Sequence, residues 1–129
     1  MLAKLLAFAS LTEIGTGLAV IVAPNIVVTL LLAGDVSGVG IAVARCFGVA
    51  LLALALACWP ARQQAASGSA AVRAMLVYNA LIAMFLVYLY TVAHVGGVLL
   101  WPGALLHATV AILLVLAWRA ERSTFAPAE

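Results

Sequence analysis

Four apolar runs, each close to the length of a bilayer crossing, dominate the sequence and limit what this chain can fold into. They cover residues 5–23, 39–59, 74–93 and 97–118. A run of about 20 residues crosses the hydrocarbon core as a helix, because a helix satisfies its own backbone hydrogen bonds. The sequence therefore predicts an all-α, polytopic membrane protein. We expect a bundle of four transmembrane helices that forms one domain over residues 1–129.

The composition agrees with a lipid environment and excludes most soluble classes. Hydrophobic residues make up 68% of the chain and charged residues 8%, whereas soluble domains have about half and about a quarter. Too little polar surface remains to cover a water-soluble globule of this size. The basic residues form no cluster that could follow phosphates, so we expect no nucleic-acid partner.

The distribution of charge predicts the orientation. Five basic residues lie just beyond span ends on one side of a four-span topology: Lys4, Arg62, Arg73, Arg119 and Arg122. The loops of the other side carry Asp35 and His94 but no lysine or arginine. By the positive-inside rule, both termini face the cytoplasm. Glu13 interrupts the first run and no convincing cleavage site follows, so we expect that run to be a retained helix.

Two segments between the spans have predicted roles of their own. Residues 24–33 (PNIVVTLLLA) are apolar but too short to cross a bilayer. Pro24 suits the first turn of a helix, so we expect a short interfacial helix between the first and second spans. Residues 61–71 (ARQQAASGSAA) are small and polar, and they are expected to form a solvated connector.

Four polar side chains interrupt the spans, one in each: Glu13, Arg45, Asn79 and His107. Burying such residues in a membrane is costly, so their positions are informative. At the helical rise, they lie about 13, 21, 9 and 16 Å from the cytoplasmic ends of their spans. Glu13 and His107 then share a level, and an arginine can reach about one turn toward both. We predict that the four form a buried polar cluster.

This cluster has two interpretations. In the structural one, a Glu13–Arg45 pair only locks helices together, because pairing offsets much of the cost of burying either charge. In the functional one, Glu13, Arg45 and His107 line a small site for a lipophilic ligand, and the histidine can exchange protons near neutral pH. Tyr78 is expected to face lipid or to pack, and not to belong to a site.

Small residues predict where helices approach closely. The candidates are Gly17 in the first span and Gly40, Ala44 and Gly48 in the second. The sequence has no paired carboxylates, no Cys-x-x-Cys and no nucleophile beside a recognisable base. We therefore expect no catalytic residue, no metal site and no cofactor, and the sequence favours a protein that is not an enzyme without deciding the question.

A resemblance adds further expectations. The segment Arg45-Cys-Phe-Gly48, with the run that ends at Cys58, resembles the second helix of DoxX-like small bacterial membrane proteins. Residues 100–107 (LWPGALLH) are similar to a segment of uncharacterised bacterial four-span proteins. The resemblance implies a four-helix fold, a bacterial inner-membrane location and a role for Arg45 and Gly48. Some DoxX-like proteins are associated with quinone-linked oxidoreductase complexes.

Three functions follow as hypotheses. The first is a non-catalytic protein, either an accessory subunit of a membrane complex or a binder of a quinone or lipid at the polar cluster. The second is a small oligomeric proton-coupled transporter or channel, with Glu13 and His107 as proton carriers. The third, a quinone-linked oxidoreductase subunit, rests on the resemblance alone. Four short helices make few internal contacts, so we expect a homo-oligomer or a larger complex.

Overall fold

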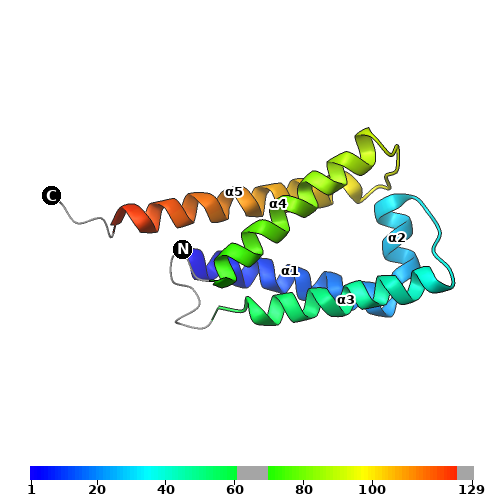
Figure 1. Cartoon of the computed structure of the whole chain (residues 1–129), viewed down its shortest axis with the longest axis horizontal. Helices are drawn as coiled ribbons and strands as arrows, with labels where there is room; N and C mark the ends of the chain where they lie inside the picture. Colours follow the sequence, from blue (N-terminus) through cyan, green and yellow to red (C-terminus); the bar gives the residue numbers. More distant parts are fainter. Residues whose placement is uncertain (61–69, 125–129) are drawn as a thin grey trace.

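The computed structural model describes residues 1–60 and 70–124, with side chains as far as residue 121, and contains no strand in these segments. Its five helices, in chain order, are α1 (Leu2–Val22), α2 (Pro24–Leu32), α3 (Val39–Ala57), α4 (Ala70–Thr91) and α5 (Leu100–Thr124) (Figure 1). All except α2 are long and apolar enough to cross a membrane. The predicted all-α fold with four spans is confirmed, and so is a short helix that begins at Pro24. Residues 61–69 of the expected connector lie outside the described residues. Residues 70 and 71 are not part of a solvated connector, because they form the start of α4 and Ala71 is buried.

The helix ends depart from the apolar runs for local reasons. α1 starts at residue 2 and not at 5, and α4 at residue 70 and not at 74, because the helices continue through Lys4 and Arg73. α5 starts at residue 100 and not at 97, because Gly97 belongs to the connector. Pro102 lies in the first turn of α5, where its missing N–H has no helical partner to lose.

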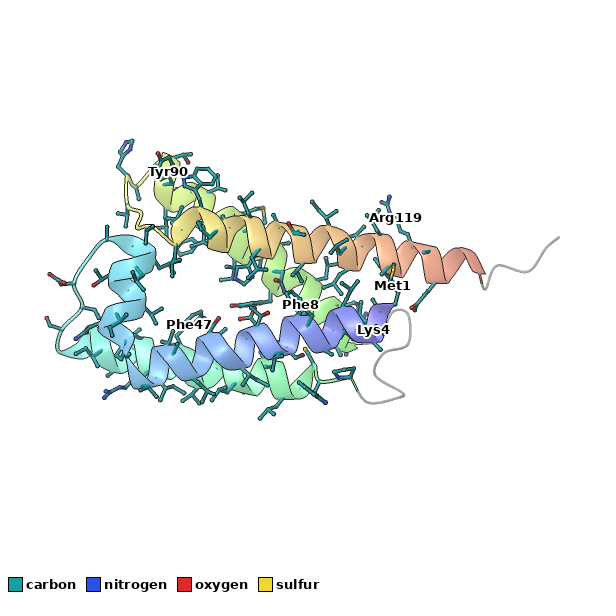
Figure 2. All side chains as sticks on the ribbon, turned by 180° about the vertical axis from the view of Figure 1, so that it is seen from behind. Met1, Lys4, Phe8, Phe47, Tyr90 and Arg119 are labelled. Carbon is teal, nitrogen blue, oxygen red and sulfur yellow. The ribbon has the colours of Figure 1, made fainter. Side chains whose placement is uncertain are left out.

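The four long helices form two antiparallel pairs (Figure 1). α1 packs mainly against α3, and α4 packs mainly against α5. α1 also contacts α5 and α4, so it joins the two pairs, while α2 lies across one end and touches α1, α3 and α5. Figure 2 shows Met1, Lys4 and Arg119 toward one end of the molecule and Tyr90 toward the other. We call these the terminal end and the α2 end.

Two apolar clusters fill the interior, one toward each end. The terminal cluster draws on α1, α4, α5 and the residue after α3: Leu2, Leu6, Ala9, Cys58, Ala71, Val72, Met75, Val110, Leu114 and Ala117. The cluster at the α2 end consists of Leu86, Leu100 and Ala104. Asn79 on α4 and His107 on α5 fall between the two clusters along their helices. The interior is therefore apolar, polar and apolar again from one end to the other.

Backbone hydrogen bonds tie the α2 end together. The N–H of Gly97 donates to the carbonyl oxygen of Leu31 at 2.8 Å, and the N–H of Leu99 to that of Leu30 at 2.9 Å. These carbonyls lie in the last turn of α2, where a helix supplies no donor of its own. A Cβ at position 97 would collide with the Leu30 carbonyl, so this close approach requires glycine. The connector between α4 and α5 thus joins the second pair to α2.

Candidate functional site: a polar layer inside the bundle

Asn79 and His107 form the centre of the site. Nδ1 of His107 lies 2.8 Å from Oδ1 of Asn79. Nδ2 of Asn79 donates to the carbonyl of Met75, one turn earlier in α4, also at 2.8 Å. This bond fixes the amide, because the flipped amide would set its oxygen against the Met75 oxygen. Oδ1 of Asn79 is therefore an acceptor, and Nδ1 of His107 carries the hydrogen between them.

Glu13 brings α1 into the same layer. Its Oε2 accepts a hydrogen bond of 3.1 Å from the Tyr78 hydroxyl. Its Oε1 lies 3.8 Å from Nδ1 of His107, which is beyond hydrogen-bond distance. The rings of Tyr78 and His107 meet edge to face, with centroids 5.7 Å apart. These three side chains and Asn79, from three helices, form one contiguous group, which we call the polar layer.

Because this layer is buried, the loss of one of its hydrogen bonds would be costly. Glu13 and Asn79 each expose 1% of their surface. The side chain of His107 exposes 14%, so the layer has one partly open edge. A buried polar group without a partner costs about 1–3 kcal/mol, which is why most such groups are satisfied.

Two polar atoms here lack a hydrogen-bond partner among the described residues. One is the hydroxyl of Ser10, which is fully buried on α1 one turn before Glu13. The other is Nε2 of His107, since the hydrogen bond of that ring runs through Nδ1. Both atoms therefore have unused hydrogen-bonding capacity among the described residues.

The structure does not bring Arg45 to this layer. Arg45 is exposed on α3, and its Nε donates to the carbonyl of Ile21 at 3.1 Å. Ile21 lies in the last turn of α1, where carbonyls lack helical donors and the helix dipole favours a cation. Within the described part of the chain, the expected Glu13–Arg45 pair is not formed. Arg45 instead caps the end of α1.

Of the predicted packing residues, Gly17 and Gly48 face each other between α1 and α3. A Cβ on either would lie 2.8 Å from the carbonyl oxygen of the other. Their backbones are therefore in direct contact, as small residues allow. Gly40 instead lies against Val36 in the preceding connector, and Ala44 is half-buried on α3.

Sequence reasoning missed Tyr78, which was expected to face lipid or to pack. Its hydroxyl belongs to the polar layer through the bond to Glu13. The sequence did contain a signal for this role of Tyr78. A phenol hydroxyl inside an apolar span needs a partner, because the hydrocarbon supplies none. Tyr78 also directly precedes Asn79, so both enter the interior at the same level of α4.

Two open apolar grooves run along the α4–α5 pair. The larger has a volume of about 340 Å³, and its lining includes Ala83 and Ala104. Ala83 follows Asn79 by one turn on α4, and Ala104 precedes His107 by one turn on α5. Its lining also includes Ala108, which directly follows His107, so the groove runs along α5 from the level of His107 toward the α2 end. The second groove, of about 250 Å³, is also apolar.

The polar layer offers hydrogen bonds and no set of metal ligands. No group of three or more His, Cys, Asp or Glu side chains gathers anywhere in residues 1–60 or 70–121. No protein-family model, curated protein or solved structure matches the chain. The resemblance to DoxX-like proteins therefore stays a prediction.

Proposed function

We propose that this small membrane protein binds a lipophilic molecule with a polar head, a quinone or a lipid, at the polar layer. The proposal rests on the arrangement of His107. Asn79 orients its ring through Nδ1, while Nε2 has no partner among the described residues. A histidine that is fixed through one nitrogen and free at the other is arranged as binding histidines are. The buried hydroxyl of Ser10 supplies a second group for a polar head.

The larger groove supports a lipophilic ligand. It is open and apolar, and Ala83 and Ala104 in its lining lie one turn from Asn79 and His107. A hydrocarbon tail in this groove would bury its surface against apolar side chains such as Met84, Trp101 and Leu105. Its head would then lie within about one helical turn, or about 5 Å, of the polar layer.

The proposed location is the bacterial inner membrane, with both termini in the cytoplasm. Lys4 and Arg119 lie toward the terminal end (Figure 2), and Arg73 is in the first turn of α4. Asp35 lies in the connector at the α2 end. This asymmetry is what the positive-inside rule associates with a cytoplasmic terminal end. The proposed partners are the bilayer and either further copies of the chain or other subunits of a membrane complex.

A proton-coupled transporter or channel is the main alternative. Glu13, Tyr78 and His107 could exchange a proton within the layer. In the described part of the bundle, however, apolar clusters lie on both sides of that layer. A proton path along the interior of a single chain would be interrupted there. A quinone-linked oxidoreductase subunit still rests on the resemblance alone.

Identification of retained molecules tests the proposal. The full chain is purified from bacterial membranes in mild detergent and extracted, and the extract is compared by mass spectrometry with bulk membrane lipid. We expect one quinone or lipid to be enriched. The enrichment should fall about tenfold in His107→Leu, because a buried head group loses its partner.

Thr91→Val is the matched control. Thr91 also lies on α4, and its exposed hydroxyl donates to the carbonyl of Val87, so the variant loses a side-chain hydrogen bond about three turns from Asn79. Equal enrichment in the wild type and in His107→Leu would contradict the proposal. Proton uptake by protein-containing liposomes, followed with a pH-sensitive dye and abolished by His107→Leu, would favour the transporter instead.

A further inference from the structure

We infer that the polar layer selects lipophilic molecules whose head donates a hydrogen bond, that is, a hydroxyl head, over molecules whose head only accepts one. This deepens the proposed function and rests on it. The selection comes from a relay of fixed hydrogen-bond roles that begins at a backbone carbonyl and ends at Nε2 of His107.

The relay begins at Met75. Its carbonyl accepts from Nδ2 of Asn79 at 2.8 Å, which leaves Oδ1 as the only atom of that amide that can meet His107. Because Oδ1 accepts, Nδ1 of His107 must donate. A neutral imidazole carries one ring hydrogen, so Nε2 is left as a bare acceptor. The backbone of α4 thus sets the tautomer of a histidine on α5.

The geometry also indicates that His107 is neutral. A protonated imidazole beside a carboxylate forms a short charge-assisted hydrogen bond of about 2.8 Å. Here Nδ1 lies 2.8 Å from the neutral amide oxygen of Asn79 and 3.8 Å from the Glu13 carboxyl. Glu13 instead accepts from the Tyr78 hydroxyl. Separated charges at this depth would also carry a large desolvation cost.

Ser10 does not alter this preference. Its unpartnered hydroxyl can rotate to donate or to accept, so it accommodates either kind of second polar atom on a ligand. Nε2 of His107 cannot adapt in this way as long as Asn79 holds Nδ1. The discrimination between a hydroxyl and a carbonyl head therefore depends on His107 and, through it, on Asn79.

Decylhydroquinone and decylquinone form a suitable pair of probes, because they share a carbon skeleton and differ in whether the head donates. Their binding to the full chain in lipid nanodiscs is measured by calorimetry under anaerobic conditions, with empty nanodiscs as the reference. We expect the hydroquinone to bind about tenfold more tightly, since the quinone would set an oxygen lone pair against that of Nε2.

The variant Asn79→Leu tests whether Asn79 sets the tautomer of His107 or only stabilises the fold. Without the Asn79 oxygen, His107 can carry its hydrogen on either nitrogen, so the preference should fall to within about twofold while some binding persists. Thr91→Val should keep the full preference, since its lost bond to Val87 is remote from the layer. NMR of the ring nitrogens in a His94→Gln background should show hydrogen on Nδ1 of His107 and none on Nε2.

The outcomes that overturn the inference are distinct. Equal or tighter binding of the quinone by the wild type, or a hydrogen on Nε2 of His107, removes the selectivity but leaves ligand binding intact. Failure of both probes to bind above empty nanodiscs also overturns it. In that case the molecules retained through purification still decide, separately, whether the polar layer binds any lipophilic ligand.

Discussion

Gly17 and Gly48 bring the backbones of α1 and α3 into contact, so that a Cβ on either glycine would lie 2.8 Å from the carbonyl oxygen of the other. Gly17 lies one turn from Glu13 on α1. The contact therefore holds α1 against α3 beside the polar layer, while Glu13 meets Tyr78 on α4.

Replacement of either glycine by alanine should destabilise the protein. Gly17→Ala or Gly48→Ala must push α1 and α3 apart, which typically costs about 1–3 kcal/mol. Denaturant titration of the detergent-solubilised protein, followed by circular dichroism, measures the change. Gly15→Ala is the control on the same helix, because a Cβ there meets nothing within 4 Å. An equal loss in Gly15→Ala would mean that the close approach is not the cause.

Double-mutant cycles should couple Glu13 to Tyr78 and not to Arg45. Glu13→Gln with Tyr78→Phe disrupts one hydrogen bond from both sides, so we expect a coupling of about 0.5–1.5 kcal/mol in unfolding free energy. Glu13→Gln with Arg45→Gln should be additive to within about 0.5 kcal/mol, since Arg45 bonds to Ile21. Strong coupling in the second cycle would indicate that Glu13 and Arg45 do pair, as the sequence suggested.

Gly97→Ala should loosen the α2 end. The new Cβ collides with the Leu30 carbonyl and displaces the connector from α2. Losing two backbone hydrogen bonds should cost about 1–3 kcal/mol and speed amide hydrogen exchange at residues 97 and 99. Gly34→Ala is the control, because the nearest atom to its Cβ, the Leu32 oxygen, is 4.0 Å away. Unchanged exchange at these residues would show that a Cβ at position 97 is accommodated without breaking the two bonds, which would contradict the prediction.

Cysteine labelling should reveal the proposed orientation. In a background without Cys46 and Cys58, which are the free thiols, Ser37→Cys should react with an impermeant maleimide from outside the cytoplasm. Lys4→Cys should react only after the membrane is opened, because the positive-inside rule places the terminal end in the cytoplasm. The reverse pattern would invert the proposed topology.

The sequence predicted the fold well because bilayer thickness and helical rise together determine the length of a span. The four spans appear as helices, and Pro24 marks the short one. Helix ends were less predictable, because an apolar run marks only the part of a helix that lies in the hydrocarbon core. Lys4 and Arg73 are charged yet continue their helices beyond it.

The candidate site was predicted in part. Glu13, Asn79 and His107 do come together, although depths of about 9 and 16 Å had been expected for Asn79 and His107. Those estimates counted from Arg73 and Trp118, which need not lie at one level when helices cross, as α4 and α5 do (Figure 1). For Arg45, a long side chain can turn toward either membrane surface, so its position alone could not select a partner.

The bonds from Gly97 and Leu99 to the last turn of α2 also constrain how the molecule is made. During synthesis, α2 emerges well before the connector that completes its hydrogen bonding. In a nascent chain that ends after α4, the carbonyls of Leu30 and Leu31 therefore lack these two donors. The hydrogen bonding of α2 is completed only once residues 97 and 99, just before α5, have been synthesised.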